Sequence, residues 1–266
     1  MKQQEGIMST CPIRFVNMRC TAKFLLFCLA ISTNILAQEP FWQPTNGPNA
    51  ADLRALAINA SGHIFAASYG GGIFRSMDNG DNWTAVNRGL ANTNVRALAI
   101  DPTSGHIFAG TDGGGIFRSM NNGDNWTAQN SGLLNFNISA LAINSSGHIF
   151  AGTDGGGIFR SMDNGENWTA VNIGLGSTSR VGALAINSTS GHVFAGTNSR
   201  VYRSMDNGES WASVSGPPFY TVVALAINSR GHIFWGDGGV YRSTNNGNSW
   251  TAVNSGLPST SRVILN

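Results

Sequence analysis

Residues 75–83 read RSMDNGDNW, and four close copies of this stretch follow along the chain. The copies are RSMNNGDNW at 118–126, RSMDNGENW at 160–168, RSMDNGESW at 203–211 and RSTNNGNSW at 242–250. Serine, aspartate or asparagine, glycine and tryptophan therefore recur at one fixed spacing, each time after an arginine. Repetition at a fixed period predicts a fold of repeated units, and the copies either carry reactive groups or hold that fold together.

The tryptophans mark a repeat of 39 to 43 residues, and each unit holds four strand-like pieces. In residues 95–130 these pieces are VRALAI, GHIFAGT, GGIFRS and NWTA, separated by polar, glycine-rich and Asn-Gly turns. Four short strands in each unit of about 40 residues are typical of a β-propeller blade. The sequence therefore predicts an all-β fold, a β-propeller with five full four-stranded blades.

Both ends of the repeat region are incomplete units. FWQPTNGP (41–48) matches a fourth strand, and SRVILN (261–266) matches a first strand, so we expect a partial sixth blade. Either the ring closes imperfectly or C-terminal blades are missing from the sequence. The second alternative is favoured, because the first would leave a buried type of strand with an unpaired edge. Residues 38–266 are then a propeller domain that is truncated at its C-terminus.

Residues 1–37 have the features of a signal peptide. Arg19 and Lys23 precede the apolar run FLLFCLAISTNILA, and Ala37 offers a small residue for cleavage. Met18 is an alternative start that would give a leader of ordinary length. The apolar run is shorter than the roughly 20 residues that span a bilayer. We therefore expect cleavage and export to the periplasm, the cell surface or the medium, with no transmembrane span.

The chain after residue 37 has 12 basic and 13 acidic side chains and no cysteine. A nearly neutral surface argues against nucleic acid as a partner. Disulfides and cysteine chemistry are excluded in this part of the chain. Its histidines occupy one position of the repeat, so a ring of blades spreads them apart and no metal site or cofactor is expected. They are His63, His106, His148, His192 and His232.

The pattern Ser-x-Asp-x-Gly-x-x-Trp resembles the Asp-box, also called the bacterial neuraminidase repeat (BNR), over residues 41–266. Propellers with this motif include sialidase-like, sortilin-type and photosystem II assembly factor-like proteins. The resemblance implies that the motif lies on the hairpin between the third and fourth strands, away from the catalytic face. Its positions here are Ser76, Asp78, Gly80, Trp83, Ser119, Asn121, Gly123, Trp126, Ser161, Asp163, Gly165, Trp168, Ser204, Asp206, Gly208, Trp211, Ser243, Asn245, Gly247 and Trp250.

The chemistry of these residues also favours a structural role. A short acceptor side chain can bond a backbone N–H two residues on, the serine can add a local hydrogen bond, and glycine can take a positive φ. The tryptophan is expected to pack between blades. Asn121 and Asn245 replace aspartate in two copies, and an amide accepts a hydrogen bond but cannot transfer a proton as a carboxylate does. The arginine before each serine is expected to cover or bond the neighbouring blade.

The resemblance to sialidases implies an arginine cluster, a tyrosine nucleophile with a glutamate partner, and an acid/base aspartate. After residue 37 the glutamates are Glu39 at the mature terminus and Glu166 and Glu209 inside the repeated turns, so none is free to pair with a tyrosine. We therefore expect a non-catalytic binding or scaffold module for a glycan, peptide or protein. The alternative is a sialidase-like glycoside hydrolase whose catalytic residues are unrecognised or missing.

Candidate ligand-binding residues lie where the blades differ from one another. In a propeller, the turns between the second and third strands share one face with the links between blades, and that face also holds the mouth of the central channel. Trp235 replaces an alanine of the other units, and it either fills a gap in a short blade or lines a pocket. The candidates are Asp112, Asp154 and Asp237 in the turns, next to Tyr69 in the first copy; Phe219 and Tyr220 as a stacking platform in the link 215–222; Arg54 and Arg96 near the channel mouth; and Trp235.

Overall fold

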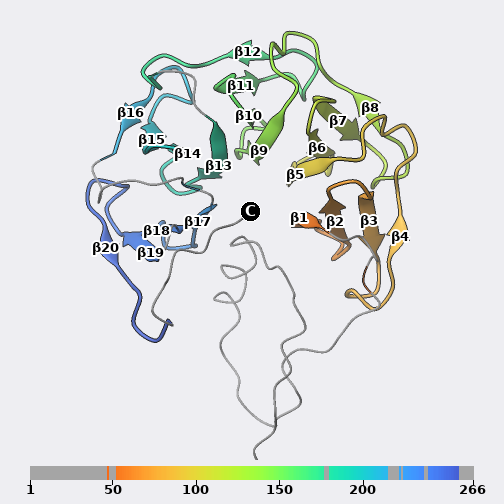
Figure 1. Ribbon diagram of the computed structural model, residues 1–266, viewed down its shortest axis with the longest axis horizontal. Coiled ribbons are helices and arrows are strands. Elements are labelled where there is room, and N and C mark those ends of the chain that lie inside the picture. The colour runs from red at the N-terminus through yellow and green to blue at the C-terminus, as the bar shows by residue number, and fades with distance from the viewer. Residues whose placement is uncertain are drawn as a thin grey trace, which may run out of the picture.

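The computed structural model describes residues 47, 52–176, 180–214, 222, 224–236 and 239–257. These residues form 20 β-strands and no helix. The strands make five four-stranded antiparallel sheets, each in simple meander order, and the sheets are arranged as blades around a common centre (Figure 1). The predicted β-propeller with five full blades is confirmed. The leader and, apart from Gly47, the segments proposed for a sixth blade lie outside the described residues.

The strand bounds repeat from blade to blade. Blade 1 holds β1 (Leu53–Ile58), β2 (Ile64–Ser68), β3 (Gly72–Ser76) and β4 (Thr84–Ala85); blade 2 holds β5 (Val95–Ile100), β6 (Ile107–Thr111), β7 (Ile116–Ser119) and β8 (Thr127–Ala128). Blade 3 holds β9 (Ile138–Ile143), β10 (Ile149–Thr153), β11 (Ile158–Ser161) and β12 (Thr169–Ala170); blade 4 holds β13 (Val181–Ile186), β14 (Val193–Thr197), β15 (Val201–Ser204) and β16 (Ala212–Ser213). Blade 5 holds β17 (Ala224–Ile227), β18 (Ile233–Gly236), β19 (Val240–Ser243) and β20 (Thr251–Ala252). The outer strands are only two residues long, shorter than the sequence pattern suggested.

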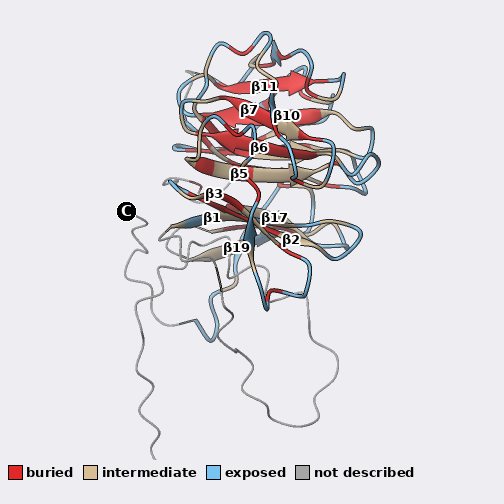
Figure 2. Ribbon diagram, turned by 90° about the vertical axis from the view of Figure 1, so that its right-hand side faces the viewer, coloured by how far each residue is buried: buried red, intermediate tan, exposed pale blue. Residues whose placement is uncertain are grey.

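The core lies between the blades. The inner strands β1, β5, β9, β13 and β17 line the centre, each in contact with the next (Figure 1). The second strands of blades 2 to 4 are buried on both faces (Figure 2). Their glycines make room for the next blade, since a Cβ on Gly110 would lie 2.5 Å from Ile138 Cγ2. Tight apolar packing of this kind needs glycine although glycine weakens a strand.

The repeated turn between the third and fourth strands is closed by hydrogen bonds within the turn. Ser76 Oγ is buried, donates to Asp78 Oδ1 at 2.8 Å and accepts the Gly80 N–H at 2.8 Å. Asp78 Oδ1 accepts the backbone N–H of Asn82 at 2.9 Å, four residues on rather than the expected two. The bond reaches further because Asn79 and Gly80 both take positive φ, 58° and 98°, and wrap the chain around the carboxylate.

The two asparagine copies make the same turn. Asn121 Oδ1 accepts the backbone N–H of Asn125 at 2.9 Å, and Asn245 Oδ1 accepts that of Ser249 at 2.9 Å. A carboxylate is therefore not needed to close the turn, because an amide oxygen is a sufficient acceptor.

The tryptophan at the end of the turn bonds the preceding blade. The indole N–H of Trp126 donates to Val86 O at 2.7 Å, and Trp168 and Trp211 bond the equivalent carbonyls of Gln129 and Val171. These three rings are 4% exposed. Trp83 is half-buried and bonds Gly80 O of its own turn, and the described residues contain no sheet before β1. The predicted packing between blades is present in blades 2 to 4.

Arginine side chains of blades 1 to 4 and histidine side chains of blades 1 to 3 contact the repeated turn of the next blade. Arg75 donates to Asn122 O at 2.7 Å, and the same bond recurs from Arg118 to Asn164, from Arg160 to Asn207 and from Arg203 to Asn246. The predicted arginine contact is therefore present. The histidine ring also reaches across, since His63 Nδ1 lies 2.8 Å from Asn122 Nδ2. This contact of the ring joins two blades, because Asn122 projects from the turn of the next blade.

Two further features of the described residues concern metals and membranes. Histidine, aspartate and glutamate side chains form no cluster there that could hold a metal ion. No helix in this part of the chain has the length and apolar character needed to cross a bilayer.

Candidate functional site

The turns between second and third strands and the links between blades lie on one face, as expected. Gly113 N–H and Gly115 N–H in the turn after β6 both donate to Phe136 O in the link between blades 2 and 3, at 3.1 and 3.0 Å. The backbone N–H of Tyr69 donates to Asp52 O at 2.9 Å, and that of Asp112 donates to Asn94 O at 2.9 Å. This face is therefore built of loops that hold one another through backbone bonds.

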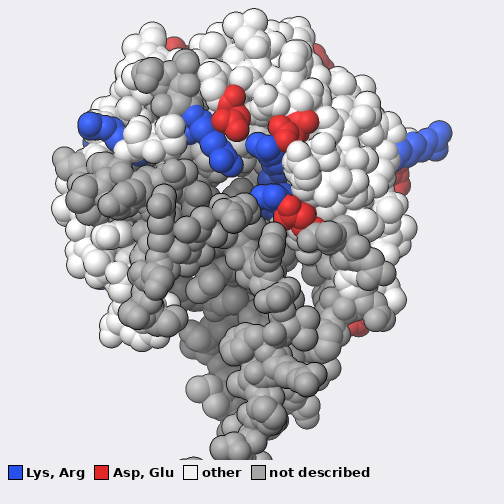
Figure 3. Space-filling view, viewed as in Figure 1, with Lys and Arg blue, Asp and Glu red and all other residues white. Residues whose placement is uncertain are grey.

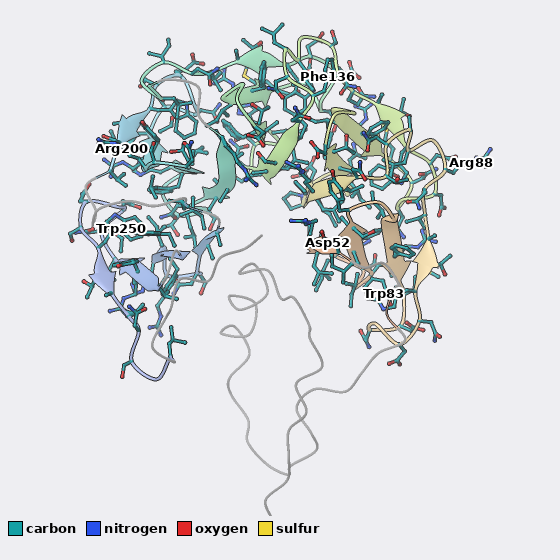
Figure 4. The ribbon with its side chains drawn as sticks, in the orientation of Figure 1. Asp52, Trp83, Arg88, Phe136, Arg200 and Trp250 are labelled. Atoms are coloured by element: carbon teal, nitrogen blue, oxygen red, sulfur yellow. The ribbon has the colours of Figure 1, made fainter. Side chains whose placement is uncertain are left out.

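A cluster of charged and aromatic side chains lies near the centre of this face. Figure 3 shows acidic and basic side chains gathered around the hollow at the centre, and Figure 4 marks Asp52 beside the inner end of blade 1. We call this group the mouth cluster. Its members are Asp52, Arg54, Tyr69, Arg96, Asp112 and Asp154.

Arg96 and Asp112 connect three blades within the mouth cluster. Arg96 Nη2 donates to Asp112 Oδ2 at 2.6 Å, and Arg96 Nη1 lies 3.8 Å from Asp154 Oδ2 on blade 3. Tyr69 on blade 1 donates its hydroxyl to the same Asp112 Oδ2 at 3.0 Å. One carboxylate oxygen thus accepts from a cation and from a phenol, while one arginine faces two carboxylates.

The two arginines also lie close to the ring of Tyr69. The guanidinium carbons of Arg54 and Arg96 are 5.6 and 5.9 Å from its centroid, within the range of a cation–π attraction. Arg54 is also paired with Asp52. The exposed fractions of the side chains are 37% for Arg54 and 25% for Arg96, so both remain partly open to solvent.

The sequence predicted four of the six cluster members as ligand-binding candidates, and the structure brings these four together: Arg54, Arg96, Asp112 and Asp154. Tyr69 was noted beside them. Asp52 was missed, although it stands two residues before Arg54, and alternate residues of an extended chain share a face. Ser139 and Gly182 replace the arginines in blades 3 and 4, and Ser139 Oγ bonds Val181 O at 2.6 Å. Among blades 1 to 4, arginine at this position of the inner strand is therefore confined to blades 1 and 2.

Trp235 belongs to a buried apolar cluster that includes Phe194 and Val214 of blade 4, and not to the mouth cluster. It is 2% exposed, stacks on Tyr241 with centroids 4.5 Å apart, and meets Trp250 edge-on at 6.3 Å. Of the two alternatives for this residue, filling a gap in a short blade fits this position. The other three candidates, Phe219, Tyr220 and Asp237, lie outside the described residues.

The carboxylates of the repeated turns are strongly acidic because they accept several hydrogen bonds. The Asn82 side chain lowers the pKa of Asp78 from 3.8 to about 2, and the Ser210 side chain lowers that of Asp206 to about 2. Burial alone would raise the pKa of Asp163, but bonds from Asn167 and Ser161 outweigh it and lower the value. A shallow recess of about 230 Å³ beside Asp163 is lined by residues already used in these turns.

Solved structures similar to this chain are propellers of several kinds. An ancestral GH74 enzyme is 22% identical with a TM-score of 0.67, covering 82% of this chain and 33% of its own. An extracellular domain from B. thetaiotaomicron is 16% identical with a TM-score of 0.57, covering 78% and 34%. A nidogen/laminin complex gives 14% identity and a TM-score of 0.58, covering 71% and 74%. The chain spans about a third of the length of the first two proteins.

A comparison with curated proteins found no match. Among protein families, residues 41–181 match the one described as the DUF6242 beta propeller domain. This match covers the first three described blades and more than half of the chain. The chain therefore belongs to the DUF6242 beta propeller domain family.

Proposed function

We propose that this chain is an exported, non-catalytic propeller that binds or scaffolds a glycan, peptide or protein partner on the face that carries the mouth cluster. The observation that supports this is the network around Arg96, which joins Tyr69, Asp112 and Asp154 from three blades. These residues differ between blades, whereas the residues that build the blades repeat. Side chains that break the repeat and remain partly exposed are suited to recognition.

A non-catalytic role is favoured because Asp112 and the aspartates of the repeated turns already accept hydrogen bonds within the protein. Glycoside hydrolysis usually needs two carboxyl groups that are free to act on the bond between two sugars. Asp112 Oδ2 is already engaged by Arg96 and Tyr69, and the acids of the repeated turns, which resemble Asp-boxes, are engaged by their own backbone. Propellers similar to this chain include one in a protein–protein complex and one extracellular domain, which supports binding and export.

Binding and turnover can be separated in one set of experiments. Soluble protein should release no product from a panel of aryl glycosides, and arrays of glycans and peptides should show saturable binding. That binding should be lost in Arg96→Ala, or in Phe219→Ala or Tyr220→Ala if the proposed platform is used. Met77 is an exposed residue in a repeated turn away from the mouth cluster, so Met77→Ala is the matched control and should keep the binding. Export is tested by sequencing the N-terminus of the secreted protein, which should begin at Gln38.

The alternative function is a sialidase-like glycoside hydrolase. It is favoured by one arrangement, the hydroxyl of Tyr69 bonded to Asp112 with two guanidinium groups within 6 Å of the same ring. Sialidase-like chemistry would use such a tyrosine with an acidic partner and arginines for the substrate carboxylate. Turnover of an aryl sialoside or glycoside that disappears in Tyr69→Phe, Asp112→Asn or Asp154→Asn would establish this alternative and overturn the non-catalytic proposal.

A further inference from the structure

The link between blades 2 and 3 exposes two large apolar side chains. Leu134 is 84% exposed and Phe136 is 43% exposed. Figure 4 marks Phe136 on this link, which runs from β8 to β9. The equivalent link between blades 1 and 2 has Ala91 and Thr93 at these two positions. The apolar pair is therefore absent from the preceding link and is not required by the repeat.

Hydrogen bonds hold the backbone of this link in place. Asn135 Oδ1 accepts the backbone N–H of Asn137 at 2.8 Å, and Asn135 Nδ2 donates to Asp154 O at 3.1 Å. Phe136 O accepts two further backbone N–H groups from the turn after β6. Leu134 and Phe136 thus project from a preorganised backbone, which lowers the entropy lost when a partner binds.

The link lies between two carboxylates that share one cation. Its bonds reach Gly113, next to Asp112, on one side and Asp154 on the other. Arg96 donates to Asp112 at 2.6 Å but stays 3.8 Å from Asp154, whose side chain is 43% exposed. The Asp154 carboxylate is therefore less closely engaged by Arg96 than Asp112 is, and it is exposed enough to meet a cationic side chain of a partner beside the apolar pair.

We propose that Leu134, Phe136 and Asp154 form a docking surface for a protein or peptide segment that presents an apolar side chain next to a lysine or arginine. The inference rests on the proposed binding function and selects a protein or peptide as the partner. Apolar anchors surrounded by charge are typical of protein interfaces. An exposed aliphatic side chain such as Leu134 gives a sugar no flat ring on which to stack.

The test uses short random peptides displayed on phage. The library is selected on the whole protein alone, and the enriched peptides are then tested on the double variant Leu134→Ala, Phe136→Thr. This variant copies the residues of the preceding link, so its sequence already suits this fold. Enriched peptides should pair a large apolar residue with a lysine or arginine. A synthetic copy of the most frequent peptide should bind the protein and lose about tenfold or more in affinity to the double variant.

A second variant tests the charge. Asp154→Asn should weaken binding of the same peptide by about two- to tenfold and reduce the dependence of its affinity on salt, because one rim charge is removed. Met162 is an exposed residue in the repeated turn of the same blade, so the control variant Met162→Ala should leave the affinity unchanged.

The outcomes distinguish this inference from the proposed function. Acidic enriched peptides, or affinity that the double variant leaves unchanged, would overturn the docking surface and leave a binding module in place. Glycan binding without any enriched peptide would do the same. Absence of both peptide and glycan binding would overturn the docking surface together with the proposed function.

Discussion

The indole N–H of Trp126 donates to the backbone carbonyl of Val86, which belongs to the preceding blade, at 2.7 Å. The ring is 4% exposed, so this bond lies in the interior where water cannot replace it. Trp168 and Trp211 repeat the contact. Adjacent blades are therefore joined by a buried aromatic ring and a directional bond at the same point.

Replacing Trp126 by alanine should lower the free energy of unfolding by about 3–5 kcal/mol, since a large buried ring and its hydrogen bond are both lost. Trp83→Ala should cost clearly less, because the Trp83 ring is half-buried and bonds only its own turn. Urea denaturation followed by circular dichroism measures both. Equal costs for the two changes would contradict the role assigned to the contact between blades.

Gly89→Ala should be severely destabilising. A Cβ at this position would lie 2.2 Å from the backbone oxygen of Trp126, and the residue has a φ of 83°. Gly105→Ala is the matched control, because its φ is 73° and nothing lies within 4 Å of the added Cβ. Both changes carry the left-handed strain of about 1–2 kcal/mol, and only the first adds the clash. The difference between their melting temperatures measures the cost of the clash between the added Cβ and Trp126 O. Similar melting temperatures would show that the backbone moves to relieve this clash at little cost.

Acid should lower the free energy of unfolding, because it protonates the aspartates of the repeated turns. The pKa of Asp78 and that of Asp206 are each about 2, below the ordinary value of 3.8. A pKa that is lower in the folded state gives stability that is present above about pH 4 and is lost as the pH falls toward 2. The double variant Asp78→Asn, Asp206→Asn should therefore lose less stability between pH 5 and pH 2.

Thermal melts at pH 7, 5, 3 and 2 compare this variant with the unchanged protein. At pH 7 the two should differ little, because Asn121 and Asn245 already close the same turn with an amide. Parallel acid profiles for the two proteins would show that these carboxylates do not contribute to the acid response.

The hydroxyl of Tyr69 and the carboxylate of Asp112 should be energetically coupled. In a double-mutant cycle with Tyr69→Phe and Asp112→Asn, we expect a coupling energy of about 0.5–1.5 kcal/mol, as for a hydrogen bond to a partly exposed charge. Tyr202→Phe is the control for loss of a tyrosine hydroxyl outside the mouth cluster. It should change stability little, since phenylalanine occupies the equivalent positions 74, 117 and 159. A coupling energy near zero in chemical denaturation would show that the mouth cluster is not held together by this bond.

The repeat made most of the fold predictable from the sequence. The apolar second strand, the turn glycines and the tryptophan each recur at a fixed spacing, and in blades 2 to 4 each recurs in the structure with the same burial. The role of the arginine before each serine was also predictable, because a long cationic side chain at a repeated rim position has only the next blade to bond.

The details that depend on backbone conformation were not predictable. The sequence suggested that the Asp78 side chain accepts an N–H two residues on. Because Asn79 takes a left-handed conformation, the carboxylate instead accepts the N–H of Asn82. The same asparagine position carries the side chain that meets the histidine of the preceding blade, as Asn122 meets His63. Local pattern says nothing of such contacts, since the partners lie 59 residues apart.

The mouth cluster was predictable only in part. Departures from the repeat indicated Arg54, Arg96, Asp112 and Asp154, and the common face of turns and links implied that they lie on one side. The sharing of Arg96 by two carboxylates could not be derived, because it depends on the distance between blades 2 and 3 at the mouth. Nor did the pattern indicate Leu134 and Phe136, whose exposure is unusual only by comparison with Ala91 and Thr93.

The tryptophan bonds between blades, and one arginine bond beside each of them, end on backbone carbonyl oxygens, which every residue possesses. Gln129 stands where Val86 and Val171 stand in the neighbouring blades, and the tryptophan bond is kept. A blade can therefore change its surface side chains, or be duplicated or exchanged for a sister blade, and keep these bonds to the carbonyl oxygens of its neighbours. Such an architecture allows natural variants to differ in their exposed faces while they keep the same arrangement of blades.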